Sequence, residues 1–246
     1  MNAKMKLSLL ILLILSAVML AACGGGGGTS PSVNTAEGLW QGPSSTGATV
    51  TVAVLENGES WGGATVGNAL VSALAGTANG NGTAFSASGA EFYFTSNTVG
   101  TGTLSGTVTQ KQRIQATSST GGSVNLAYNN YYDQGVTAAD IAGSYTLSGR
   151  SASYSVPAMT FTISPTGSFT IVQTGCTTTG TATPRASGKA IVNVTATGTG
   201  SSCALSSGVS MSGIAVLDKS VTPNNLFFMA LNAAKTDGLV LLGRKN

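Results

Sequence analysis

The sequence contains no histidine, and only 8 % of its 246 residues are charged. The absence of histidine excludes Ser-His-Asp and Cys-His catalysis and the usual zinc sites, because each of them uses an imidazole. The eight acidic residues show no calcium-loop spacing, and the glycine-rich stretches fit neither the Walker nor the dinucleotide fingerprint. We therefore predict a protein that is not an enzyme, with no catalytic residue, no metal site and no cofactor.

Two short patterns are candidates for catalysis. Ser187 and Lys189 are close in sequence, but a loop explains them, and no Ser-x-x-Lys follows the N-terminal apolar run. Glu56 and Glu59 flank Asn57-Gly58, and a carboxylate pair can hydrolyse glycosides. Solvated charges at a hairpin tip are the simpler interpretation, so neither pattern is assigned a catalytic role.

Basic residues are equally scarce. Of the 11 lysines and arginines, Lys4 and Lys6 precede the N-terminal apolar run, which leaves 9 basic against 8 acidic residues. The remaining chain has no basic patch that could neutralise a row of phosphates. We predict no nucleic-acid partner.

The longest apolar stretch lies near the N-terminus. Lys4 and Lys6 precede an almost wholly apolar run from Leu7 to Met19, which ends in Leu20-Ala21-Ala22-Cys23. This order of charge, apolar run and small residues is typical of a secretory signal. The 16 residues from Leu7 to Ala22 are fewer than the ~20 that a membrane-spanning helix needs, which disfavours an uncleaved transmembrane segment. Residues 1–22 are predicted to be a signal peptide.

Leu20-Ala21-Ala22-Cys23 resembles the lipobox of bacterial lipoproteins. The resemblance implies cleavage before Cys23 and acylation of both its thiol and its new amino group. Two or more acyl chains hold a protein stably, so the resemblance implies attachment to a membrane through the N-terminal lipid. Enteric lipoproteins retained in the inner membrane carry Asp after the lipidated cysteine. Gly24 stands there in this chain, which favours the outer membrane and leaves its periplasmic or surface face open.

Cys23 is followed by five glycines and by Thr29-Ser30-Pro31-Ser32-Val33-Asn34-Thr35. Ordering a glycine run costs too much backbone entropy for it to pack in a core. We predict that residues 23–35 form a lipidated, flexible tether that reaches on the order of 20 Å.

The rest of the sequence favours an all-β fold. Glycine, threonine and serine fill its polar positions, and apolar residues alternate with polar ones in stretches such as 49–54 and 159–164. Asn57-Gly58 and Pro165-Thr166-Gly167 are turn signals between such stretches. Closing the last strand against the first would remove exposed edges, as in small up-and-down barrels.

The chain restarts its own pattern half-way. Gly143-Ser144-Tyr145 repeats the Gly-x-aromatic start of Gly38-Leu39-Trp40, after a predicted short helical turn over 137–142 with Thr137 as its N-cap. We predict two small antiparallel β-barrel or β-sandwich halves, residues 36–136 and 137–246, with one larger barrel as the alternative. This architecture, the tether and the strand starts resemble the transferrin-binding-protein B-like and factor H-binding-protein-like surface lipoproteins.

Two cysteines remain besides Cys23. Cys176 and Cys203 are an even pair in an exported chain, so we predict a disulfide between them rather than two buried thiols. Their separation does not match the Cys-x-x-Cys spacing of redox motifs.

Two functions remain open. The first is a membrane-anchored, non-catalytic envelope lipoprotein that binds a macromolecule, with a protein as one possible partner, or has a structural role in the envelope. The alternative is a lipocalin-like barrel that binds a small apolar ligand. Trp40, Trp61 and Tyr145 could line its cavity, although core packing is the simpler role for such side chains.

Overall fold

The computed structural model describes residues 34–67, 69–151, 155–203 and 207–246. These residues form strands β1 to β16, one 3-10 helix and one short α-helix, which confirms the all-β prediction. No helix in the described ranges is long and apolar enough to cross a membrane.

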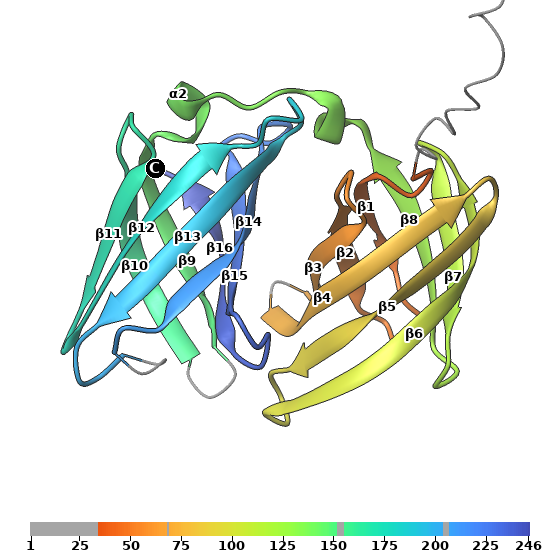
Figure 1. The fold of residues 1–246 in the computed structure, drawn as a ribbon, viewed down its shortest axis with the longest axis horizontal. Helices are drawn as coiled ribbons and strands as arrows, with labels where there is room; N and C mark the ends of the chain where they lie inside the picture. The colour runs from red at the N-terminus through yellow and green to blue at the C-terminus, as the bar shows by residue number, and fades with distance from the viewer. Residues whose placement is uncertain (1–33, 68, 152–154, 204–206) are drawn as a thin grey trace, which may run out of the picture. The chain divides into compact units, whose positions relative to one another are not determined.

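The first half of the body is a closed antiparallel barrel in which every strand pairs with the next and β1 pairs with β8 (Figure 1). Its strands are β1 (Gly38–Pro43), β2 (Thr49–Val54), β3 (Glu59–Val66), β4 (Ala69–Asn81), β5 (Ala84–Tyr93), β6 (Thr98–Thr109), β7 (Arg113–Ser118) and β8 (Ser123–Asn129).

The second half is a second closed barrel, in which β16 pairs with β9. Its strands are β9 (Gly143–Arg150), β10 (Ser155–Ile163), β11 (Ser168–Gln173), β12 (Cys176–Pro184), β13 (Ile191–Thr199), β14 (Ser210–Asp218), β15 (Asn225–Asn232) and β16 (Gly238–Lys245). The chain thus forms two barrels, and the alternative of one larger barrel is wrong.

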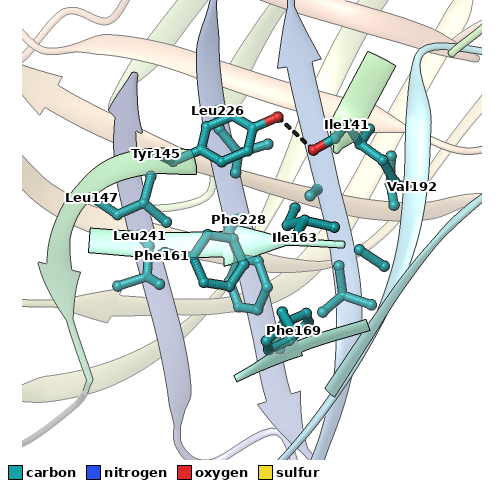
Figure 2. Packing of buried hydrophobic residues seen from close by; sticks show 14 of the residues in the cluster. Ile141, Tyr145, Leu147, Phe161, Ile163, Phe169, Val192, Leu226, Phe228 and Leu241 are labelled. Atoms are coloured by element: carbon teal, nitrogen blue, oxygen red, sulfur yellow. Dashed lines mark hydrogen bonds between the residues drawn. The ribbon is translucent and has the colours of Figure 1, made fainter. Parts of the chain in front are cut away.

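Side chains fill the interior of each barrel, because an eight-strand barrel is only just wide enough for them. Trp40, Phe85 and Ile114 lie in the apolar cluster of the first barrel. In the second barrel, Phe161 contacts Phe169 and Phe228 with ring centroids 5.0 and 6.3 Å apart (Figure 2). The two-residue alternation of the strands supplies these inward residues.

The two barrels begin in the same way. Trp40 Nε1 donates a hydrogen bond to the carbonyl of Ala36, four residues upstream. The Tyr145 hydroxyl likewise donates to the carbonyl of Ile141, four residues upstream (Figure 2). Both rings are fully buried, so each closes one end of its barrel with its only polar atom satisfied. The repeated Gly-x-aromatic pattern therefore has one structural role in both halves.

The first hairpins are equivalent too. Gly58 and Gly167 both have φ of 83°, a left-handed conformation that favours glycine. Their carbonyls accept hydrogen bonds from Ala78 and Ala182, at the same place in the two barrels.

A short segment joins the barrels. It contains the 3-10 helix η1 (Asn130–Asp133) and the helix α2 (Ala138–Ile141). Thr137 caps α2 and forms a reciprocal capping box with Asp140, as the predicted helical turn requires. The predicted boundary at 136/137 falls inside this segment, and independent folding of the two halves stays a prediction.

One predicted strand is less buried than expected. The aromatic run Phe92-Tyr93-Phe94 predicts a buried strand, but Tyr93 is 41 % exposed, whereas Phe92 and Phe94 are buried. The two phenylalanines lie on the outer face of the barrel and belong to an apolar cluster that also contains residues of the second barrel, while Tyr93 lies at the end of β5.

Phe161→Ala should lower the free energy of unfolding by about 3–5 kcal/mol, because the fully buried ring leaves a cavity among its aromatic neighbours. Val172 is a matched hydrophobic control that is 76 % exposed, and Val172→Ala should change the free energy of unfolding by less than about 0.5 kcal/mol. Urea unfolding followed by fluorescence measures both. Equal effects for the two variants would contradict the filled interior.

Candidate functional surfaces

The N-terminal end of the body is bound to the first barrel. The Asn34 carboxamide oxygen accepts hydrogen bonds from the backbone N–H groups of Gly80 and Ala36, and its amide nitrogen donates to the Ala78 carbonyl. Thr35 bonds to Gly80 and Gly82 in the same β4–β5 hairpin. Asn34 and Thr35 were predicted to belong to the flexible tether, but these bonds place them on the barrel. Cys23 and residues 24–33 lie outside the described residues.

An apolar cluster joins the two barrels. It combines outward-facing residues of both barrels with Tyr132 of the connecting segment. The buried residues of this junction are Leu39, Ala53, Leu55, Trp61, Ala73, Ala75, Phe92, Phe94, Tyr132, Ile191, Ile214, Val216, Met229, Leu231 and Val240. It explains why the run 226–231 is apolar on both faces, since one face lines the second barrel and the other enters the junction.

Tyr132 is the polar centre of the junction. Its hydroxyl donates to Glu37 at 3.1 Å and lies 3.4 Å from the carbonyl of Val54. Burial, followed by the Glu37 charge, raises the pKa of Tyr132 above its ordinary value. The phenol therefore stays neutral and acts as a hydrogen-bond donor.

Asp133 is the charged centre at the edge of the same junction. Its carboxylate accepts hydrogen bonds at 2.8 Å from Lys111 and from Lys189, and at 2.9 Å from the Tyr128 hydroxyl. The hydrogen bonds from Lys111 and Lys189 hold the pKa of Asp133 below its usual range.

Lys189 and Glu56, one residue from each of the two catalytic candidates, both form ion pairs. The hydrogen bond to Asp133 raises the pKa of Lys189, which favours the charged form of this ion pair. Glu56 forms an ion pair with Arg185 at 2.8 Å, and Glu59 opens strand β3. These contacts give Lys189 and Glu56 structural roles.

Hydroxyl groups form rows on the outside of the second barrel. The register aligns them across neighbouring strands, and the Thr181–Thr195 and Thr197–Ser210 hydroxyls lie 2.8 and 3.0 Å apart. One row is Thr162, Thr170, Thr179, Thr197 and Ser210, and the next is Ser168, Thr181, Thr195 and Ser212. We call these two lines the hydroxyl rows; they contain no charged residue.

The first barrel has a similar line. It runs through Asn79, Ser86, Ser105, Thr117 and Ser123 across five strands. Ser105, Thr117 and Ser123 also border an open groove of about 430 Å³ on the barrel exterior. The hollow at this place is therefore outside the barrel wall and is lined mainly by neutral polar side chains.

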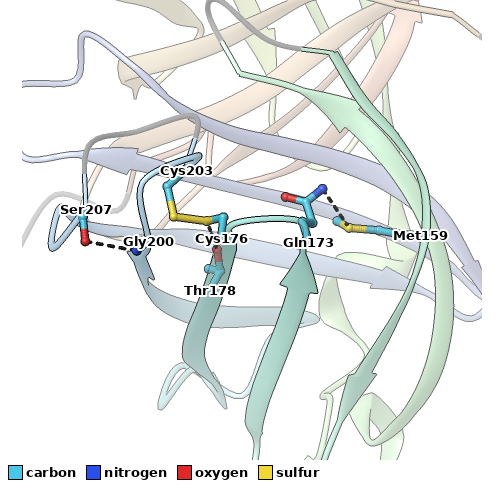
Figure 3. Close-up of a disulfide and its surroundings, with 7 residues drawn as sticks. All are labelled: Met159, Gln173, Cys176, Thr178, Gly200, Cys203 and Ser207. Carbon is cyan, nitrogen blue, oxygen red and sulfur yellow. Dashed lines mark hydrogen bonds between the residues drawn. A yellow bond between two sulfur atoms is a disulfide. The ribbon is translucent and has the colours of Figure 1, made fainter.

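The disulfide predicted between Cys176 and Cys203 is present (Figure 3). It links the start of β12 to the loop after β13. The neighbouring pair of strands, β10 and β11, is joined by only two residue pairs. In the loop-entropy model a closure of 27 residues contributes about 3–4 kcal/mol to stability.

The three aromatic residues considered for a ligand cavity all belong to packed clusters. Trp40 lies in the first interior, Tyr145 in the second and Trp61 in the junction. The sequence signal for the hydroxyl rows was the alternation of threonine in β10 to β13, but only the strand register shows that these residues align. No pattern in the sequence around Tyr132 and Asp133 indicates that these two residues lie between the barrels.

No family model matches this chain, and no curated protein matches it. One similar solved structure is a Bacteroides fragilis protein described as a "putative outer membrane protein". The alignment covers 85 % of this chain and 96 % of that chain, with 12 % sequence identity and a TM-score of 0.23. A similarity at this TM-score supports no statement about the fold or the function of this chain.

Asp133→Asn should lower the free energy of unfolding at pH 7 by about 1 kcal/mol or less, because it removes two partly exposed ion pairs. The pKa of this carboxyl is lowered by folding, so its contribution is present above the unfolded pKa of about 4 and is lost as the pH falls further. The stability difference between wild type and variant should therefore shrink below about pH 4.

Urea unfolding at a series of pH values measures this difference. Glu59→Gln is the matched control, because Glu59 makes no ion pair among the described residues. A pH-independent difference for Asp133→Asn would contradict the role of its charge.

Proposed function

We propose that this protein is a membrane-anchored, non-catalytic envelope lipoprotein whose two-barrel body binds an uncharged polar macromolecule through its outer surface. Export and lipid attachment are supported by the apolar N-terminal run that ends in Leu20-Ala21-Ala22-Cys23. The Asn34 contacts support a defined end of the tether on the first barrel.

The observation that carries the binding role is the pair of hydroxyl rows. Each hydroxyl is both a donor and an acceptor, and none is next to a charge within its row. Such a surface fits a partner that also offers neutral donors and acceptors, such as an uncharged polysaccharide. A partner that binds by ion pairing finds few counter-charges here.

The lipocalin-like alternative receives less support. Apolar clusters occupy the interior of both barrels, and the second one holds Phe161, Phe169 and Phe228 in mutual contact. A small apolar ligand would have to displace packed side chains.

Cys23→Ala should abolish lipid attachment, because the lipobox chemistry requires the thiol of this residue. Metabolic labelling of the full-length protein with a palmitate analogue, followed by membrane fractionation, tests this. The unlabelled variant should leave the membrane pellet, while the wild type stays in it. Label on the Cys23→Ala protein would refute the proposed anchor.

The hydroxyl rows can be tested by placing charge in them. The double variant Thr179→Lys/Thr195→Lys should reduce retention of the full-length protein on an insoluble neutral polysaccharide. Each exposed lysine would be covered by the bound polymer without a counter-charge, and covering an unpaired charge is costly. Wild-type retention should persist at high salt, since contacts between uncharged groups are not screened.

Ala234→Lys is the matched control, because it adds charge in an exposed turn of the same barrel outside the rows. Retention of wild type and double variant to the same extent on every neutral polymer tried would count against this surface.

A further inference from the structure

Strand β6 extends beyond its neighbour. Its residues Thr98–Thr103 pair with β5, whereas its pairing with β7 begins only at Leu104 and Ser118. The N–H of Ser119 donates to the Thr103 carbonyl at 3.0 Å and ends the ladder on that side. Within the described part of the chain, residues 98–102 thus have a strand on one side only, and we call them the free edge.

Antiparallel alternation decides which backbone groups face outward at this edge. The N–H of Val108 donates to the Thr83 carbonyl, so the backbone N–H and C=O groups of even-numbered β6 residues point toward β5. The bond from Ser119 to the Thr103 carbonyl shows that those of odd-numbered residues point to the opposite side. Val99 and Thr101 therefore present both their N–H and C=O groups to the open side. These four groups lie symmetrically about Gly100.

The free edge lacks the usual protection against strand pairing. Natural edges carry charged residues, proline or bulges that block another strand. Residues 98–103 read Thr-Val-Gly-Thr-Gly-Thr, the β5–β6 register is continuous, and Val99 is 47 % exposed. This segment is accessible and carries nothing that would repel an added uncharged strand.

We propose that the free edge pairs antiparallel with the free edge of a second copy, which gives a two-fold symmetric dimer through β6. In the register that places Gly100 opposite Gly100 of the second copy, Val99 faces Thr101 in both directions. All four outward groups of each chain then form hydrogen bonds, four bonds in total. Ser119 occupies the position opposite Thr103 and stops the added strand from sliding further.

A second copy is the occupant that these features favour. The unpaired groups are symmetric about one residue, so a two-fold, isologous contact satisfies all of them at once. The residues on the axis are glycines, which allow the close approach of a pair that is not hydrogen-bonded. No charge in residues 98–103 opposes its own copy. This inference does not depend on the proposed envelope function.

Cysteine cross-linking tests the register. In a pair that is not hydrogen-bonded the two Cα atoms lie about 4.5 Å apart, so Gly100→Cys should form a disulfide between copies under mild oxidation. Gly102→Cys is the matched control, because in this register its two copies are about 13 Å apart, beyond disulfide reach.

Both sites can hold the new side chain. A Cβ atom at Gly102 meets nothing within 4 Å, and one at Gly100 meets only the end of the half-exposed Tyr93 ring at 3.1 Å. The full-length protein in detergent is analysed on non-reducing gels, and the wild type reports any cross-link through Cys23. Equal cross-linking of the two variants, or none for Gly100→Cys, would overturn the proposed register.

The dimer itself is measured by sedimentation velocity of the full-length protein in detergent. The wild type should be dimeric and Thr101→Pro monomeric, because proline removes an edge N–H that bonds only to the second copy. Thr101→Val keeps this N–H and should remain dimeric. Circular dichroism and thermal melting verify that the proline variant is folded. A monomeric wild type, or a dimer that survives in folded Thr101→Pro, would refute the proposal.

Discussion

The structure depends on closure of two antiparallel ladders, β1 against β8 and β9 against β16. Closure pairs the backbone groups that open sheets leave at their edges, and it forces every second side chain into a narrow interior. The inward residues must then be apolar and of the right size, as Phe161 and Trp40 are. The outward residues do not have to be apolar or of a given size, so the chemical character of the outer surface can differ from one part of the barrel to another.

Three kinds of outer surface result. One part is apolar and is buried in the junction around Tyr132. A second part consists of neutral hydroxyl and amide groups, aligned in rows by the strand register. A third is the free edge of β6, where β6 extends beyond the end of β7. Function in this protein is therefore expected on the outside of the barrels, since packed side chains occupy the inside.

The junction combines interactions of different strength. Burial of the apolar residues contributes most, because each large side chain removed from water stabilises by about 1.5–3 kcal/mol. The Asp133 ion pairs are partly exposed and contribute less, but they orient Lys111 and Lys189 around the connecting segment.

Trp40 and Tyr145 occupy equivalent places in the two barrels. In each barrel a buried aromatic ring closes one end and donates a hydrogen bond to the carbonyl four residues upstream.

Local patterns in the sequence determined the all-β class, the strand at 49–54, the part of β10 within 159–164, the glycine turns at Gly58 and Gly167, the helical turn after Thr137 and the cysteine pair. Each of these depends on neighbouring residues or on simple counting. Only the tertiary structure decided that there are two barrels, that Phe92 and Met229 face a junction, that threonines align in rows and that residues 98–102 remain an edge. These features depend on strand register and on contacts between distant segments. A periodicity of two residues shows that a side chain alternates between faces, but it does not show what each face meets.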